Sequence, residues 1–309
     1  MIISASRRTD VPAFYSDWLM NRIEAGHCCV VNPFNANQVS RVPLAPQDVD
    51  VIVFWTKNAT PLMPRLPELD SRGYRYYFQY TVNGYPAALE PGLPPLDECI
   101  QTFRRLSDLI GPERVIWRYD PIIVSDETSE EYHASRFELI AGRLSGATGR
   151  VVISVADEYR AAKGRLRRLE IGYRQADPEA PAFGGMMRRL AEVASGAGME
   201  IFSCAEVLDL TPFGIAPGKC VDDAYIRRVF GVEVVGRKDK TQRLECGCVA
   251  SKDIGAYDTC LHGCAYCYAT RSAGAAAKNR ENHDPISASL VGSHECDSEE
   301  NPTGQRSLF

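Results

Sequence analysis

The sequence lacks several features that would assign a protein to a class at once. It has no run of about 18 consecutive apolar residues, so we expect no membrane-spanning helix and no membrane partner. The opening MIISASRRTD passes from a short apolar segment directly into charge, without the longer apolar stretch of a signal peptide, which predicts a cytoplasmic protein. The 309 residues carry 35 basic and 40 acidic side chains and no strong basic stripe, which argues against nucleic acid as a partner.

The glycine-rich turn of dinucleotide-binding sheets is also missing. Instead, short segments rich in Val, Ile, Phe and Tyr alternate with segments of helical spacing. The predicted strands are Ile2–Ala5, Cys28–Val31, Val51–Trp55, Tyr74–Tyr80, Val115–Tyr119, Val151–Val155 and Glu200–Cys204. Helices are predicted over Ala13–Glu24, between Pro95 and Gly111, over Glu130–Leu144 and over Met186–Ala197. This alternation predicts an α/β fold with a parallel sheet, and we favour a closed or partial (β/α) TIM-type barrel over a doubly wound sheet.

Polar residues follow most of the predicted strands. Because the carboxyl ends of parallel strands meet at one rim, where barrel enzymes carry their chemistry, these residues are candidate catalytic residues. They are Arg7, Asp10, Lys57, Gln79, Arg118, Asp120 and Glu206. The cations suit a carboxylate or phosphate on a small-molecule substrate, and the acids suit hydroxyl binding or proton transfer. The alternative is that these residues form ordinary salt bridges at the rim.

The sequence is rich in cysteine, with eleven residues. In a reducing cytoplasm this number favours metal binding or redox chemistry over a disulfide framework. The strongest pattern is CLHGCAYC, which places Cys260, Cys264 and Cys267 within eight residues. Three thiolates at this spacing can hold three corners of a 4Fe–4S cluster and leave one iron open. A zinc site that adds His262 or an upstream cysteine is the competing interpretation.

The CxxxC-aromatic-xC pattern resembles the signature of radical S-adenosylmethionine (SAM) enzymes. The resemblance implies that Cys260, Cys264 and Cys267 bind the cluster and that Tyr266 lies on the adenine side of SAM. It also implies cleavage of SAM to a 5′-deoxyadenosyl radical, with electrons from an external donor such as a flavodoxin or ferredoxin. Those enzymes usually carry the triplet near the N-terminus; here the loop follows the barrel and has to fold back over its rim.

Two further resemblances extend this comparison. The continuation Tyr268-Ala269 is similar to the loop of spore-photoproduct-lyase-like members, which makes repair of a nucleic-acid lesion an alternative reaction. The whole chain resembles a bacterial family of unknown function, through ISASRRTDVPAFY, NPFN, VFWTKN, WRYDPII, the cysteine-rich segment and the terminal SLF. This second resemblance implies no substrate.

A second group of cysteines precedes the triplet. We expect Cys204, Cys220, Cys246 and Cys248 to bind an auxiliary iron–sulfur cluster or a zinc ion, unless they are reduced residues packed beneath the loop. We expect Cys28, Cys29 and Cys99 to lie in the core and Cys296 to be a free thiol of the tail.

The composition divides the chain into a barrel domain (1–244), a cysteine-rich iron–sulfur segment (245–271) and a partly ordered or disordered tail (272–309). The sequence therefore predicts a radical SAM enzyme with an unknown small substrate. The principal alternative is a barrel protein that binds iron–sulfur or zinc and does not cleave SAM.

Overall fold

Eight parallel strands form the central sheet of the molecule. The computed structural model describes residues 1–156, 160–294 and 296. The strands are β1 (Ile2–Ala5), β4 (Val51–Thr56), β5 (Tyr76–Thr81), β6 (Val115–Ile122), β7 (Arg150–Val155), β8 (Glu200–Cys204), β9 (Ala216–Gly218) and β10 (Lys252–Asp253). Their order across the sheet is β10-β1-β4-β5-β6-β7-β8-β9, and every neighbouring pair is parallel. The predicted α/β fold with a parallel sheet is confirmed.

One predicted strand does not belong to this sheet. Cys28–Val31 lies in β2 (His27–Asn32), which pairs antiparallel with β3 (Asn35–Pro43) as a separate hairpin. The prediction that it belongs to the alternating parallel strands is therefore wrong. The physical reason is the short connection, because two neighbouring strands joined by a tight turn pair antiparallel and a parallel pair needs a crossover.

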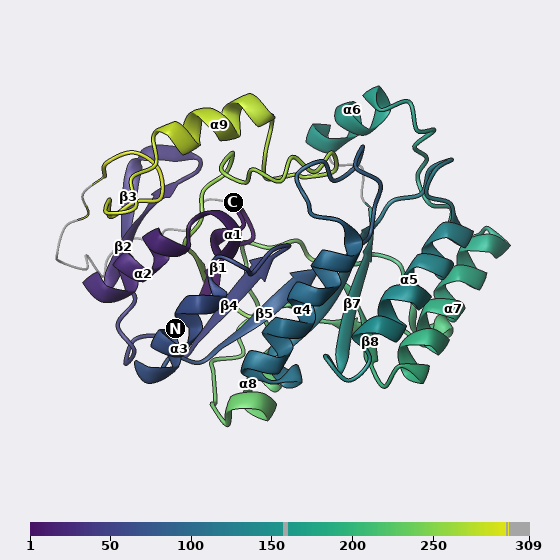
Figure 1. The fold of residues 1–309 in the computed structure, drawn as a ribbon, viewed down its shortest axis with the longest axis horizontal. Coiled ribbons are helices and arrows are strands. Elements are labelled where there is room, and N and C mark those ends of the chain that lie inside the picture. The colour runs from purple at the N-terminus through teal and green to yellow at the C-terminus, as the bar shows by residue number, and fades with distance from the viewer. Residues whose placement is uncertain (157–159, 295, 297–309) are drawn as a thin grey trace.

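Helices cover the two faces of the sheet unequally (Figure 1). One face is covered by α1 (Val11–Phe14), α2 (Ser16–Ala25), α3 (Leu66–Ser71), α4 (Leu96–Ile110), α5 (Glu130–Leu144) and α7 (Pro181–Gly196). The other packs against α8 (Asp223–Phe230) and the chain that leads to β10. Short 3-10 helices lie at Met63–Arg65, Pro112–Arg114 and Thr211–Phe213. The helix predicted over Ala13–Glu24 is interrupted at Tyr15, whose φ of −136° is outside the helical region.

Each strand contributes to two cores because alternate side chains point to opposite faces. In β1, Ile3 packs with the helices of the first face, whereas Ile2 packs against α8 and its flanking chain. The second core also holds Cys220, Cys246 and Cys248. These cysteines are therefore buried on the α8 side of the sheet.

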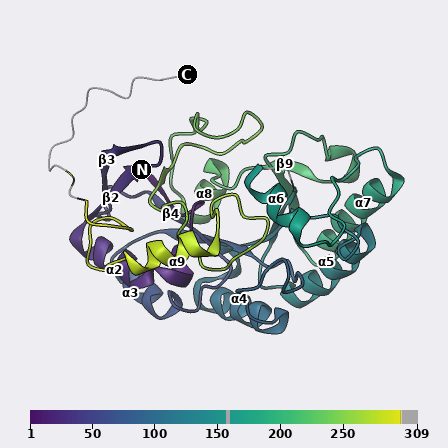
Figure 2. The same ribbon diagram turned by 90° about the horizontal axis from the view of Figure 1, so that it is seen from above.

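The carboxyl ends of all eight strands point to one edge of the sheet, as parallel pairing requires. Two further helices, α6 (Arg160–Arg168) and α9 (Ala273–Glu281), lie beyond this edge (Figures 1 and 2). The chain after α9 returns to α2, where Trp18 Nε1 donates a hydrogen bond of 3.0 Å to Ser287 O. The hairpin and the tail are then joined by a disulfide between Cys29 and Cys296.

This disulfide corrects the prediction that Cys296 is a free thiol. Cys29 is buried as expected, but it is covalently paired rather than merely packed. Cys28 and Cys99 are buried free thiols, as predicted. Sequence reasoning missed the pair because the two cysteines lie 267 residues apart and meet only when the tail packs beside the hairpin.

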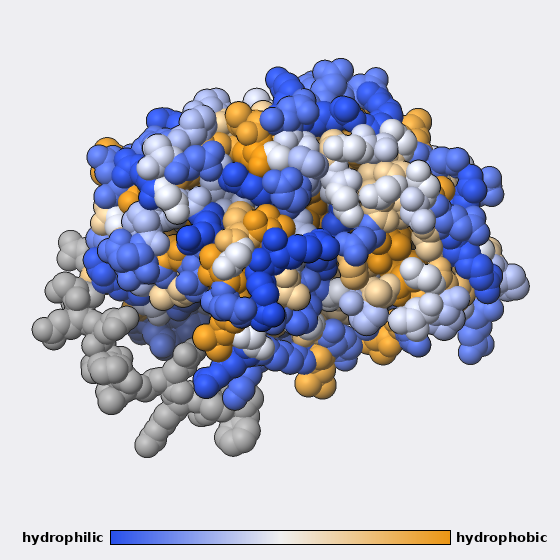
Figure 3. Space-filling model, turned by 90° about the horizontal axis from the view of Figure 1, so that it is seen from below, coloured by the Kyte–Doolittle hydropathy of each residue, from blue (hydrophilic) through white to orange (hydrophobic). Residues whose placement is uncertain are grey.

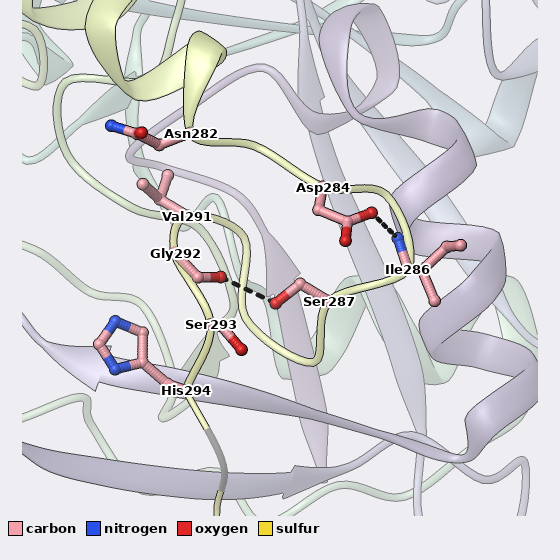
Figure 4. Close-up of a pocket in the computed structure, with 8 residues that line it drawn as sticks. All are labelled: Asn282, Asp284, Ile286, Ser287, Val291, Gly292, Ser293 and His294. Atoms are coloured by element: carbon pink, nitrogen blue, oxygen red, sulfur yellow. Dashed lines mark hydrogen bonds between the residues drawn. The ribbon is translucent and has the colours of Figure 1, made fainter.

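The tail also forms a surface hollow of about 480 Å³ (Figure 4). Its lining comes entirely from the segment after α9 and includes Asp284, Ser287 and His294. On the face seen from below, apolar side chains lie among hydrophilic ones (Figure 3). Across the described ranges, the helices are all too short or too polar to cross a membrane.

Candidate metal and substrate site at the strand ends

The CLHGCAYC loop is docked onto the carboxyl ends of the strands by hydrogen bonds along its length. Its contacts are Tyr15 Oη to Thr259 O (2.7 Å), Gly92 N to His262 O (3.0 Å), Ala265 N to Leu89 O (2.9 Å) and Tyr268 Oη to the Arg7 carbonyl (2.9 Å). From the far side, Arg165 of α6 donates to Ala265 O at 2.9 Å. The loop is thus placed by the β1 and β5 connections although it lies at the opposite end of the sequence.

Of the three cysteines of this loop, Cys264 is buried and Cys260 and Cys267 are half-buried. Burial raises the pKa of Cys264 to about 12 and, with the nearby Asp10 carboxylate, raises that of Cys260. The charges of Cys264 and Cys267 raise the pKa of Cys260 further, so the thiolate forms repel one another. Three soft, mutually repelling donors with little solvation suit a thiophilic metal or cluster. Within residues 1–156, 160–294 and 296, however, no group of three or more His, Cys, Asp or Glu side chains already has metal-binding geometry.

A buried carboxylate, Glu90, organises the side of the loop that carries Cys264. Glu90 Oε1 accepts hydrogen bonds from Lys57 Nζ at 2.8 Å, from Asn83 Nδ2 at 3.3 Å and from the Tyr266 hydroxyl. Lys57 Nζ also lies 5.5 Å from the centre of the Tyr266 ring. Burial lowers the pKa of Lys57, but Glu90 and Cys264 outweigh it and the pKa is raised, so the side chain stays charged.

Sequence reasoning did not find Glu90 or Asn83. Asn83 follows β5 and could therefore have been included with the other polar strand ends. In the structure its Nδ2 also donates to Asp120 O at 3.0 Å. Glu90 lies in the proline-rich connection between β5 and α4, and no motif in that segment distinguishes it. Only the fold brings it beneath Tyr266.

Each carboxylate oxygen of Asp10 accepts two hydrogen bonds, so Asp10 acts as a positioning group. One carboxylate oxygen accepts from Ala13 N (3.0 Å) and Thr56 Oγ1 (2.8 Å), and the other accepts from Lys57 N (2.7 Å) and His262 Nε2 (2.8 Å). Both partners in the last contact are buried. His262 Nδ1 is buried and has no hydrogen-bond partner within the described chain.

Two of the remaining predicted residues, Arg7 and Arg118, flank Trp55 on the other side of the strand ends. The guanidinium carbons of Arg7 and Arg118 each lie 5.2 Å from the Trp55 ring centre. Arg118 binds Asp120 Oδ2 through two nitrogens at 2.7 and 3.1 Å, and Ser154 donates to the other oxygen of Asp120.

The side chains of Gln79 and Glu206 form hydrogen bonds with backbone groups. Gln79 Nε2 donates to Cys220 O at 2.8 Å, and Glu206 Oε1 accepts from Val155 N at 2.7 Å. The predicted residues therefore form two groups. Asp10, Lys57 and Tyr266 adjoin the triplet, whereas Arg7, Gln79, Arg118 and Asp120 lie between the strand ends and the second set of cysteines.

That second set is drawn together by the fold. Cys204 Sγ and Cys220 Sγ are 2.9 Å apart, and Cys248 Sγ accepts backbone hydrogen bonds from Cys220 and Val221 at 3.3 and 3.4 Å. The neighbouring thiols of Cys220 and Cys246, together with Arg7, hold the pKa of Cys248 well below its usual range. Arg118 Nη1 donates to Cys220 Sγ at 2.7 Å.

Comparison with known proteins places the chain in a family without a described activity. No curated protein matches it. A family model described as "Domain of unknown function (DUF1848)" matches residues 2–269, from the first strand to two residues beyond Cys267. The match covers the central sheet, both sets of cysteines and every predicted site residue. The chain therefore belongs to the DUF1848 family.

Proposed function

We propose that this protein is a radical SAM enzyme whose cluster loop, Cys260–Cys267, is supplied from the C-terminal side of the chain. The observation that carries the proposal is the docking of a CxxxCxYC loop on the strand ends through Asp10, Gly92 and Arg165. The loop thus occupies the rim on which α/β enzymes of this architecture assemble their sites, although it follows the sheet in sequence.

The proposal also includes a more specific description of the fold, a partial (β/α) barrel. Seven of the eight parallel strands, with helices on one face and α8 on the other, come from residues 1–244 and support a partial (β/α) barrel. Residues 245–271 would then be the appended iron–sulfur segment. This segment adds β10 beside β1 and packs Cys246, Cys248 and Val249 against the α8 face of the sheet.

Cys260, Cys264 and Cys267 would hold a 4Fe–4S cluster, which when bound supplies reductive cleavage of SAM to a 5′-deoxyadenosyl radical. The residues around the loop would bind and orient the reactants. Lys57 is a half-buried cation beside Cys264 and suits a carboxylate, and Tyr266 offers an aromatic ring with its hydroxyl fixed by Glu90.

The substrate side would be formed by Asp120, which is held by Arg118 and Ser154 yet keeps part of its side chain accessible. Asp120 can accept a hydrogen bond from a hydroxyl or amine of a small substrate or take up a proton. The loop and α6 would exclude water from this space. A flavodoxin or ferredoxin of the cytoplasm would supply the electron.

A closed zinc site is the second candidate, and one observation favours it. His262 Nε2 is oriented by Asp10, while its Nδ1 is buried and has no partner among the residues that the structure describes. This is the arrangement of a histidine ligand held by a carboxylate. A Cys₃His site of this kind would have no open position and would not cleave SAM.

Electron paramagnetic resonance of the reconstituted protein distinguishes the two candidates. After anaerobic loading with iron and sulfide and reduction with dithionite, we expect a 4Fe–4S signal that changes when SAM is added. Cys264→Ala is expected to lose the signal, whereas Cys99→Ala, which removes a buried thiol from α4, is expected to keep it. A wild-type protein that takes up zinc at the triplet but no cluster would overturn the proposal.

A further inference from the structure

Four cysteines outside the triplet lie together on the α8 side of the sheet. Cys204 ends β8, Cys220 follows β9, and Cys246 and Cys248 precede β10. We propose that these four thiols bind a single divalent ion of the Zn²⁺ class in a closed tetrahedral site. This inference does not depend on SAM cleavage at the triplet.

Cys248 lies in the apolar second core, yet its sulfur has polar donors of the kind that a metal thiolate takes. Two backbone amides, those of Cys220 and Val221, point at Cys248 Sγ at 3.3 and 3.4 Å. Amide groups directed at one sulfur stabilise it as a thiolate, the form that binds metal. Reduced cysteines packed as small hydrophobes would explain the burial but would not need these donors.

Two arginine side chains adjoin the cluster, of which Arg118 is also paired with Asp120. Four thiolates and one divalent ion carry a net charge of −2. Arg118 Nη1 donates to Cys220 Sγ at 2.7 Å, and Arg7, whose Nη2 is buried with no hydrogen-bond partner in the described ranges, lies beside Cys248. Buried charge is tolerated when it is paired in this way.

The close contact between the sulfurs of Cys204 and Cys220 favours one ion over a second cubane iron–sulfur cluster. Around a tetrahedral zinc with Zn–S near 2.3 Å, neighbouring sulfurs are about 3.8 Å apart. Cys204 Sγ and Cys220 Sγ are in thiol contact at 2.9 Å, so they would have to separate by about 0.9 Å to admit the ion. A cubane cluster takes one thiolate on each of four irons and would force the sulfurs much farther apart.

The site would act as a structural clasp. At one edge of the sheet its ligands come from β8 and from the chain after β9. At the other edge they come from the segment that runs into β10. A closed site joining these edges would fix the segment that carries the triplet. The metal site would therefore stabilise the folded structure on the α8 side of the sheet and would take no part in a reaction.

Metal analysis of a triplet variant tests the proposal directly. In full-length protein with Cys260, Cys264 and Cys267 all changed to Ala, purified under reducing conditions and dialysed against EDTA, we expect about one zinc per chain, as for other closed structural sites. Adding Cys220→Ala or Cys248→Ala to this background is expected to reduce zinc by about tenfold or more. Adding Cys28→Ala, which removes a buried cysteine of the hairpin, is expected to leave the zinc unchanged.

A second measurement avoids variants that fail to fold. In wild-type protein, zinc should protect Cys204, Cys220, Cys246 and Cys248 from alkylation, as located by peptide mass spectrometry, and chelation under denaturing conditions should expose them. Cobalt substitution should give the intense visible bands of a tetrahedral thiolate site. Stoichiometric iron and sulfide in the triplet variant, or a Cys204–Cys220 disulfide in protein without metal, would overturn the proposal.

Discussion

His262 Nε2 lies 2.8 Å from Asp10 Oδ2, and this hydrogen bond joins two buried residues that are 252 positions apart in the chain. The same Asp10 carboxylate caps α1 and binds the end of β4 through Thr56 and the next residue, Lys57. The cluster loop is therefore fixed to the end of β1 through a residue that the sequence suggested for catalysis. Its contacts assign Asp10 a positioning role.

Asp10→Ala is expected to destabilise the protein and release the loop. The change leaves several buried donors without an acceptor, and each such loss costs about 1–3 kcal/mol, so we expect a decrease in the free energy of unfolding of about 3 kcal/mol or more. Urea unfolding of the protein without metal measures it. Asp17→Ala, which removes an exposed ion pair with Arg65, should change stability by less than about 1 kcal/mol. Equal effects of the two changes would contradict the role given to Asp10.

Gly92→Ala tests how closely the loop packs on the β5–α4 connection. A methyl group at position 92 would lie 2.5 Å from the His262 carbonyl oxygen, and the amide of Gly92 donates to that oxygen at 3.0 Å. We expect the loop to be displaced and the iron content after reconstitution to fall several-fold. Gly142→Ala is the matched control, because a methyl group there meets nothing within 4 Å on α5. Unchanged iron content in Gly92→Ala would show that the docking is not needed for the cluster.

Because His133 is buried and neutral, we expect the protein to become less stable in mild acid. Its Nε2–H donates to Ile123 O and its Nδ1 accepts from Tyr119 Oη, so the buried ring is neutral. Burial lowers the pKa of His133 from 6.5 to about 4. Between these values the unfolded chain binds a proton that the folded protein does not, so the free energy of unfolding should fall by about 3 kcal/mol as the pH drops through this window.

Urea unfolding at several pH values measures this effect against a control variant. His133→Phe should be less stable at neutral pH, because Tyr119 Oη and Ile123 O lose their partner. It should also lack the component of pH dependence that His133 contributes. If the variant and the wild type lost stability in parallel between pH 6.5 and pH 4, another group would be responsible.

The Cys29–Cys296 disulfide is expected to stabilise the packing of the tail. A cross-link that closes a loop of this length stabilises by up to about 5 kcal/mol in the chain-entropy model. Non-reducing peptide mapping of oxidised protein should recover the linked pair. Cys296→Ser should lower the melting temperature of oxidised protein and leave that of reduced protein nearly unchanged. Recovery of Cys29 as a free thiol throughout would contradict the pairing.

Much of the sheet could be predicted from the sequence because its strands are continuous apolar runs. β1 and β8 have their predicted bounds, and α5 does too. The hairpin strand His27–Asn32 has a composition like that of the parallel strands, and local composition does not reveal the partner of a strand. β9 and β10, with three and two residues, are too short for any periodicity to mark them.

The candidate site was predictable where a motif or a strand end marked it. The triplet and the polar strand ends fall into this class. Glu90 and the Cys29–Cys296 pair do not, because each depends on two segments that meet only in the folded chain. The division of the strand-end residues between two sets of cysteines likewise depends on side-chain direction, which the sequence does not specify.

The most direct test of the central claim is whether the reconstituted, reduced protein converts SAM to 5′-deoxyadenosine. Under anaerobic conditions with dithionite, the wild type and Cys99→Ala should form the product, whereas Cys264→Ala should form none. This result would establish a SAM-cleaving cluster at the loop that Asp10 and Gly92 hold. A wild-type protein that carries the full cluster, is reduced, and still forms no 5′-deoxyadenosine would contradict it.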